Sequence, residues 1–265
     1  MKVIIGILIV AIMATVVSCG SNAVKFPDPN LEAAIREAIN KPEGSIYPSD
    51  LEGLNQLIAN ERNITNLKGL EKCSNLTSLY LGGNEISDLS PLANLTKLED
   101  LELTGNQIKD ISPLASLTNL TYLGLGRNEI SDISSLASLV NLSSIILMAN
   151  KVSDLSPLAS LTNLQYLSLS FNRITDVSPL GSLTNLTILE LMGSPETNQI
   201  TDIQALGSLT NLITLRLFNN QVSDISPLIS LTKLRTLWIL EGNPLNEESL
   251  NVSIPQLRER GVEVR

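Results

Sequence analysis

Aliphatic residues recur along most of the chain at a fixed spacing, which indicates an internal repeat. The segment 120–133, LTYLGLGRNEISDI, returns in close copies on both sides of itself. Successive copies are 22 residues apart, with a single step of 26. A series of aspartates marks this period: Asp88, Asp110, Asp132, Asp154, Asp176, Asp202 and Asp224. Such a period predicts a stack of small units, each of which buries its apolar face against the next.

Each unit begins with a short predicted strand. Leu123 and Leu125 alternate with Tyr122, Gly124 and Gly126, and a period of two is typical of a strand with one buried face. Because so short a strand cannot cover its own leucines, we expect the units to stack into a parallel sheet. The unit also matches L-x-x-L-x-L-x-x-N, the pattern of a leucine-rich repeat. The prediction is therefore an α/β leucine-rich repeat solenoid with a concave parallel sheet.

The polar residues after each strand are interpreted as structural. An asparagine such as Asn128 can bond the backbone of its own and the adjacent coil. In Ser112-Pro113 and its equivalents the serine suits a helix N-cap and the proline the first helical position. The segment is short, so we expect 3-10 turns on the convex side. The aspartate series could hold a cation, but capping of backbone N–H groups in each turn is favoured.

Helical segments are expected at both ends of the repeats, which fill residues 54–243 in nine units. Ahead of them, residues 26–53 form the predicted N-terminal cap. Asp28 and Pro29 have the positions of an N-cap and a first-turn proline there. The helix that follows should cover the open end of the leucine core, because the end units of a solenoid face water.

Residues 244–265 form the predicted C-terminal cap. Leu250, Ile254 and Leu257 are expected to face inward from a broken helical stretch. Residues 262–264 could add a final strand after it.

The N-terminus has the layout of a secretory signal. Lys2 precedes an apolar run of 15 residues, which is short for a membrane span of about 20. The run ends in VVSCG, which resembles the lipobox of bacterial lipoproteins, in which the cysteine, here Cys19, is lipidated. We expect residues 1–18 to be a lipoprotein signal peptide and residues 19–25 a tether on an exported, membrane-anchored protein, at the cell surface or on the periplasmic side. An ordinary signal peptide with an incidental cysteine is the alternative.

Composition excludes several classes of function. The chain has no histidine, which rules out a Ser-His-Asp triad, a Cys-His pair and an imidazole metal ligand. Its net charge of -9 disfavours nucleic acid and anionic lipid as partners, so contact with a membrane is expected only through the anchor. Cys73 stands in a leucine position and is expected to be an inert core residue. No cofactor and no metal are predicted.

The chain from residue 26 onward resembles a known group of proteins. The segments that carry the resemblance are FPDPNL at residues 26–31, NITNLKGL at residues 63–70, and the repeated N-x-I-x-D-I-S-P-L with L-T-N-L. They are similar to bacterial surface leucine-rich repeat proteins of the internalin type. The resemblance implies a curved, non-enzymatic binder that presents a concave sheet. It carries over no ligand.

The outward side chains of the strands form the predicted binding surface. Five of the eight aromatic residues fall on these outward stripes, although a core of leucine and isoleucine needs none. Aromatic residues, methionine and arginine are favoured at interfaces, while tolerated drift of the repeat is the alternative reading. The residues predicted to contact a partner are Tyr80, Tyr122, Ile146, Met148, Tyr166, Ile188, Met192, Arg216, Phe218 and Trp238.

Two functions could use this face. The first is the binding of a protein partner by a monomeric module, and the alternative is carbohydrate or cell-wall binding by Tyr and Trp rings. An enzyme is not expected, because Asp100 and Glu102 lie on an open sheet that would not tune their chemistry. The four-residue insertion at residues 194–197 should bulge at the rim of the concave face. It could contact a partner or be a tolerated loop.

Overall fold

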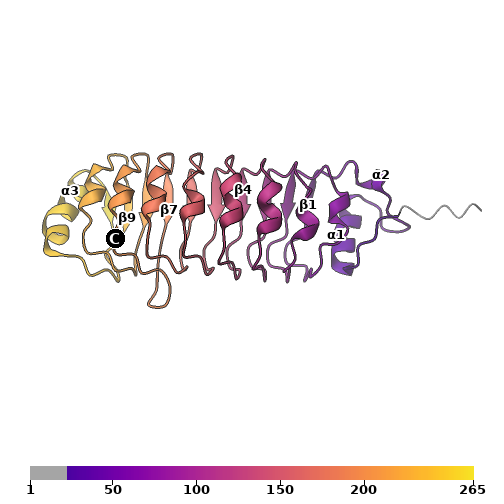
Figure 1. The fold of residues 1–265 in the computed structure, drawn as a ribbon, viewed down its shortest axis with the longest axis horizontal. Helices are drawn as coiled ribbons and strands as arrows, with labels where there is room; N and C mark the ends of the chain where they lie inside the picture. The colour runs from indigo at the N-terminus through magenta and orange to yellow at the C-terminus, as the bar shows by residue number, and fades with distance from the viewer. Residues whose placement is uncertain (1–22) are drawn as a thin grey trace, which may run out of the picture.

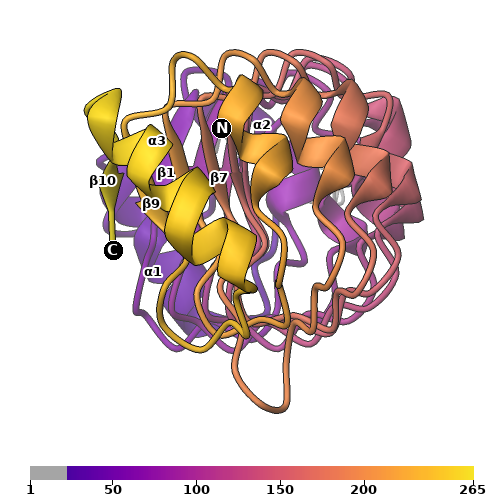
Figure 2. The ribbon, with the colours of Figure 1, turned by 90° about the vertical axis from the view of Figure 1, so that its left-hand side faces the viewer.

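The computed structural model describes residues 23–265, so the expected signal peptide and Cys19 lie outside the described residues. One parallel sheet of 10 strands runs in chain order from one end of the molecule to the other (Figure 1). Seen along the stack, the strands and the short helical turns lie on opposite sides of each coil (Figure 2). The strands are β1 (Gln56–Ile58), β2 (Ser78–Tyr80), β3 (Asp100–Glu102), β4 (Tyr122–Gly124), β5 (Ser144–Ile146), β6 (Tyr166–Ser168), β7 (Ile188–Glu190), β8 (Thr214–Arg216), β9 (Thr236–Trp238) and β10 (Glu263–Val264).

The convex side carries one 3-10 turn after each of the strands β1–β8, as predicted. Their bounds are η1 (Leu70–Lys72), η2 (Ser90–Leu92), η3 (Ser112–Ser116), η4 (Ser134–Ser138), η5 (Ser156–Leu158), η6 (Ser178–Ser182), η7 (Gln204–Ser208) and η8 (Ser226–Ser230).

The core is a continuous column of aliphatic side chains between the sheet and these turns. Each strand residue pairs with its counterpart one repeat later, so that Leu101 lies opposite Leu123 and Leu123 opposite Ile145. All three are completely buried, which confirms the predicted alternation. Cys73 is also buried and unpaired, and burial raises the pKa of its thiol to about 12. A thiol that stays protonated is a poor nucleophile, in agreement with a core role.

The asparagine that follows each strand joins neighbouring coils through hydrogen bonds. Asn106 Nδ2 donates to Leu103 O of its own coil at 2.9 Å and to Leu81 O of the preceding coil at 3.0 Å. Its Oδ1 accepts from Ile86 N at 3.0 Å. Asn198 makes equivalent bonds after the insertion, so the longer repeat leaves the ladder intact. The predicted structural role of the asparagines is confirmed.

The aspartate of each repeat caps the turn that follows it. Asp88 Oδ1 accepts from Ser90 N at 2.8 Å, and its Oδ2 accepts from Ser90 Oγ at 2.9 Å. The prediction that serine is the N-cap was wrong, because Ser90 is already the first residue of η2 and Leu89 holds the cap position. The capping acceptor is instead the aspartate two residues before the serine. The proline lies in the first turn, at the second helical position and not at the first as predicted.

The N-terminal cap is tied to the first repeat through one carboxylate. Asp28 caps α1 (Pro29–Ala38), its Oδ1 accepting from Asn30 N at 2.9 Å and Leu31 N at 3.1 Å. Its Oδ2 accepts from Thr65 N at 2.8 Å and Asn66 N at 3.1 Å. Burial by itself would raise the pKa of Asp28, but these backbone donors outweigh it and hold that pKa below its ordinary value.

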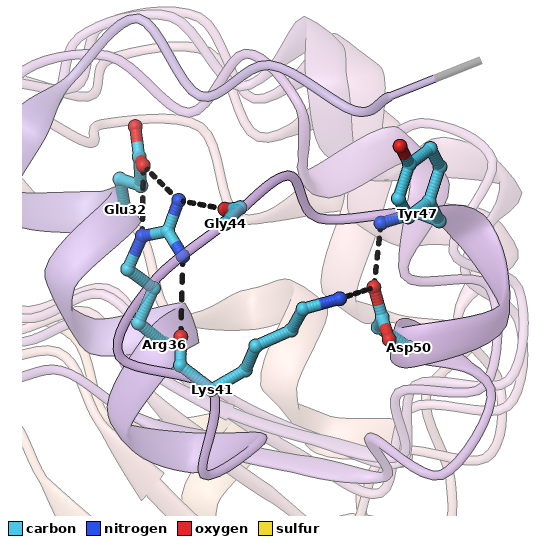
Figure 3. A network of polar contacts seen from close by, with 6 residues as sticks. All are labelled: Glu32, Arg36, Lys41, Gly44, Tyr47 and Asp50. Atoms are coloured by element: carbon cyan, nitrogen blue, oxygen red, sulfur yellow. Dashed lines mark hydrogen bonds and ion pairs between the residues drawn. The ribbon is translucent and has the colours of Figure 1, made fainter. Parts of the chain in front are cut away.

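A second polar network fixes the loop between α1 and α2 (Pro48–Leu51), as Figure 3 shows. Arg36 on α1 donates to the carbonyl oxygens of Lys41 and Gly44 at 3.1 Å and 3.0 Å. The Nζ atom of Lys41 then reaches Asp50 Oδ2 on α2 at 2.6 Å. These contacts hold together the cap that covers the first leucines of the core.

The C-terminal cap differs from its prediction in one respect. Ile254 and Leu257 face the core from α3 (Ile254–Glu259), as expected, but Leu250 is 49% exposed. A π-helical turn, η9 (Ser249–Ser253), precedes α3 and shifts the helical register by one residue. Ser249 takes the inward position, and its Oγ donates to Ser223 O at 2.9 Å.

The final strand, β10, pairs with β9 and is the last strand of the open sheet. None of the helices within residues 23–265 is both long and apolar enough to cross a membrane.

A candidate binding surface on the concave face

The concave face comprises the outward side chains of β1–β9 and those two positions after each strand. All ten residues predicted to contact a partner lie on it, and each is half-buried rather than fully exposed. They extend from Tyr80 on β2 to Trp238 on β9, a span of seven strand spacings or roughly 34 Å. Side chains on neighbouring strands contact one another across this face.

In the first half of the face, one tyrosine is fixed by a carboxylate from the preceding strand. Tyr122 OH donates to Glu102 Oε2 at 2.5 Å, and Glu102 Oε1 accepts from Thr104 N at 2.6 Å. Burial, and then the bond to Glu102, raise the pKa of Tyr122. Gly124 makes this possible, because a Cβ atom there would lie 2.1 Å from Glu102 Oε2. Glu102 is thus engaged in positioning the tyrosine.

The middle of the face is apolar and also depends on a glycine. Ile146 on β5 and Met148 beyond it lie beside Gly126 of the preceding repeat. A Cβ atom at Gly126 would come within 3.3 Å of Ile146 Cγ2 and 3.2 Å of Met148 Cγ. The two predicted contact residues therefore occupy space that the preceding strand leaves free.

In the second half, a buried glutamate joins three strands. Glu190 on β7 is 8% exposed, and its Oε2 accepts from Tyr166 OH at 3.1 Å and Ser168 Oγ at 2.9 Å, both on β6. Its Oε1 forms an ion pair with Arg216 Nη1 on β8. Burial, and then the charge of Glu190, raise the pKa of Tyr166. Sequence reasoning placed Glu190 on the outward stripe but did not name it as a site residue.

The signal that could have identified Glu190 is its register. Glu190 and Arg216 occupy equivalent positions in consecutive repeats, and the structure pairs them directly across the sheet. The sequence placed both residues on the same outward stripe, but only Arg216 was named as a contact residue.

An aromatic cluster with two arginines ends the face. The rings of Phe218 and Trp238 lie 6.0 Å apart between centroids. The guanidinium carbon of Arg216 is 4.6 Å from the Trp238 centroid, and that of Arg265 is 5.8 Å from it. A cavity of about 250 Å³ is lined by Phe218, Trp238, Glu241 and Arg265. The last two were not predicted, since they lie outside the repeated strand pattern.

The insertion forms a compact loop beyond β7, which projects from the edge of the stack in Figure 1. Ser194 Oγ and Thr197 Oγ1 lie 3.0 Å apart, and Gln199 Nε2 donates to Ser194 O at 2.9 Å. Gly193 at its base is closely packed, because a Cβ atom there would lie 2.2 Å from Asn219 O.

The part of the chain that the structure describes contains no recognisable metal site. Among residues 23–265, no group of three or more cysteine or acidic side chains is placed to hold an ion. The convex aspartates instead bond serine and backbone donors, as Asp110 does to Ser112 N at 2.8 Å. This bond lowers the pKa of Asp110.

The fold and its repeated strands define a leucine-rich repeat protein. A family model described as Leucine Rich repeats (2 copies) matches residues 74–116, 118–160, 162–208 and 210–253, so the chain belongs to this family. Within it, the chain belongs to the internalins, as two solved structures from Listeria monocytogenes show.

The first of these is an internalin, InlF, which is 38% identical, with a TM-score of 0.82 over 90% of this chain and 68% of that one. The second is internalin C2, which is 40% identical, with a TM-score of 0.76 over 81% of this chain and 94% of that one. A plant peptide hormone receptor, RGFR1, solved in complex with RGF2, is 26% identical, with a TM-score of 0.57 over 66% of this chain and 30% of that one. A search of curated proteins gives no match to the chain.

Proposed function

We propose that this internalin-type protein is a non-enzymatic module that binds a protein partner through its concave face. The observation that carries the proposal is the placement of aromatic residues. Five of the eight aromatics in the chain lie on this one face, half-buried and partly open to solvent, while the leucine column of the repeats contains none. Aromatic, methionine and arginine side chains are those that interfaces favour as anchors.

The fixed geometry of the face supports the same proposal. Glu102 holds Tyr122, and Glu190 holds Tyr166 and Arg216, before any partner is present. Anchors that are already ordered lose less conformational entropy on association, so they favour tight binding. The plant receptor, whose structure was solved in complex with RGF2, shows that a related solenoid can hold a partner.

The N-terminal sequence supports a location at the cell surface. We propose that Cys19 is lipidated after removal of residues 1–18 and that the protein is exported and anchored to a bacterial membrane. The six residues between Cys19 and Phe26 reach roughly 20 Å at most, so the solenoid would stand close to that membrane. Globomycin or Cys19→Ala should stall processing or release the protein. Unchanged membrane partitioning would contradict the anchor.

Site-directed photocrosslinking on intact source cells tests the partner-binding proposal. Leu240 is a suitable position for the probe because it lies on the concave face beside Trp238 and is 37% exposed. Exposed Ser134 on the convex side is the matched control position. We expect one protein to crosslink from position 240 and not from position 134, and to be lost in the double variant Phe218→Ala, Trp238→Ala. Equal crosslinking from both faces would contradict the proposal.

Glycan binding is the second candidate, because aromatic rings stack on sugar rings. Tyr122 on β4 and Tyr166 on β6 are two strands apart, so their backbones are roughly 10 Å apart. A glycan array that is bound by the wild type and not by Tyr122→Ala, with no protein crosslinked at position 240, would favour this alternative. Sedimentation should show a monomer in either case.

A further inference from the structure

Two buried hydrogen-bond donors at the end of the concave face have no partner, and one of them belongs to a residue that lines the cavity there. They are Trp238 Nε1 and Arg216 Nε. Within residues 23–265, no other side-chain nitrogen or oxygen is both buried and unpartnered. Leaving a buried donor unpaired costs free energy, so such groups are rare in folded proteins and point to something that completes them. Here the two lie on adjacent strands, with Arg216 stacked over the Trp238 ring.

Among the residues that line the cavity, Trp238 and Arg265 carry N–H donors, and Arg216 stacks on Trp238 from outside the lining. Arg216 uses Nη1 for Glu190, which leaves Nε free. Arg265 bonds Glu263 Oε1 through Nε at 2.8 Å and Nη2 at 2.5 Å. Glu241 is the one acidic side chain among the lining residues of this cavity. The site thus offers two unpaired N–H donors next to the rings of Phe218 and Trp238, and the charges of its arginines are met by Glu190 and Glu263.

We propose that this cavity receives the carboxylate side chain of an aspartate or glutamate in the partner protein. An apolar side chain next to that carboxylate would pack on Phe218 and Trp238. A carboxylate only accepts, and it can bond a guanidinium and an indole N–H together. The inference rests on the proposed function, because it names the chemistry of the partner at one place on the same face.

The dimensions and the cover of the site agree with a side chain as the occupant. A volume of about 250 Å³ lies below the roughly 300–1,000 Å³ of small-molecule sites. Arg265 lies over the Trp238 ring but is held by an exposed ion pair, in which its side chain is 61% exposed. Because exposed ion pairs contribute little, Arg265 can swing aside and admit a ligand group to the indole.

Trp238 is the only tryptophan in the chain, so its fluorescence reports on this site without a label. The probe is a set of end-blocked dipeptides that pair leucine or phenylalanine with aspartate or glutamate, each matched to the asparagine or glutamine form. Titrated into the full chain, an acidic dipeptide should give a saturable change in emission, and its amide form should bind roughly tenfold more weakly or worse. Added salt should weaken the acidic dipeptide. Equal responses to both forms, or no response to any acidic dipeptide, would overturn the proposal.

Four substitutions make the test more specific. Arg216→Gln should abolish the response, whereas Arg235→Gln makes the same charge change at a guanidinium that donates to Leu234 O and should leave it intact. Glu241→Gln should tighten the acidic dipeptide by a few-fold, because it removes a like charge from the lining. Circular dichroism verifies that Arg216→Gln is folded, and Arg265→Gln gives a second reading from an exposed residue.

Weaker binding of the acidic dipeptide to Glu241→Gln, or equal losses in Arg216→Gln and Arg235→Gln, would overturn the inference. The titrations decide it without any knowledge of the partner. The crosslinking from position 240 decides the proposed function, so either can fail while the other stands.

Discussion

Glu190 and Arg216 lie opposite each other on β7 and β8 and form an ion pair on the concave face. The pair is partly buried, with side chains 11% and 34% exposed. Tyr166 and Ser168 occupy the remaining acceptor oxygen of Glu190, so the carboxylate is held from both neighbouring strands. A charge pair held in this way fixes the arginine that stacks on Trp238. The acid therefore positions the C-terminal half of the candidate binding surface.

Glu190→Gln should destabilise the protein, because it leaves the half-buried Arg216 without a counter-charge. We expect the free energy of unfolding to fall by about 1–3 kcal/mol in urea denaturation followed by circular dichroism. Glu129→Gln is the control, since its ion pair with Lys151 is exposed and should contribute less than about 1 kcal/mol. Similar losses in the two variants would contradict the role given to Glu190.

Two glycine-to-alanine substitutions should destabilise the protein by different amounts, because the added Cβ meets a different kind of atom in each case. At Gly193 the added Cβ meets the backbone carbonyl of Asn219, a residue whose N–H is bonded to Glu241 O of the next coil at 2.8 Å. At Gly124 it meets the end of the flexible Glu102 side chain. We expect Gly193→Ala to lower the free energy of unfolding by about 2 kcal/mol or more, and Gly124→Ala by about 1 kcal/mol, the value of one hydrogen bond.

The two variants should also differ in how well they bind a partner. Gly124→Ala expels Glu102 from its place beside Tyr122, so partner capture at the concave face should weaken. Differential scanning calorimetry gives the order of the stability losses, and crosslinking from position 240 gives the binding. A larger stability loss at Gly124 than at Gly193 would show that the obstacle at Gly193 can yield.

The residue before each ladder asparagine except Asn198 adopts a left-handed backbone conformation. Gly105 has φ 72, whereas Ala149 stands at the equivalent place with φ 55. Because non-glycine residues are strained there, Ala149→Gly should raise the free energy of unfolding by about 1 kcal/mol, and Gly105→Ala should lower it by a similar amount. Ala93, with φ -54, is the control, where glycine should be destabilising. The same sign at Ala149 and Ala93 in urea denaturation would refute the strain argument.

The spacing of residues predicts most of this fold because each coil repeats the same contacts. The leucine alternation, the Asn128 ladder position and the 3-10 turns all follow from one unit. Failures occur where the repeat ends or changes length. Leu250 was placed inward because helical spacing does not foresee the π-helical turn before it. Asp88 was expected to cap its turn and does so, whereas the serine N-cap was wrong by one residue.

The binding surface was only partly accessible to the same reasoning. Its stripes follow from strand alternation, so residues such as Trp238 were placed on the concave face correctly. The bonds that fix them were not foreseen, because they join side chains from different repeats. Glu190 is separated from Arg216 by the insertion, and Arg265 reaches the site from the C-terminal cap. Bonds between side chains of different repeats depend on rotamers, which a pattern of positions does not specify.

The pH dependence of stability should reveal Asp28, which joins the N-terminal cap to the first repeat. Its pKa in the folded state is held below the ordinary value, so the folded chain binds fewer protons than the unfolded chain at this site. The contribution of Asp28 is therefore complete above the ordinary pKa of 3.8 and is lost as the pH falls through the lowered value. Asp28→Asn, which cannot ionise, should be less stable than the wild type by about 1–2 kcal/mol at pH 7. Urea denaturation at a series of pH values should show that difference shrinking below about pH 4, whereas a constant difference down to pH 2 would mean that the charge of Asp28 plays no part.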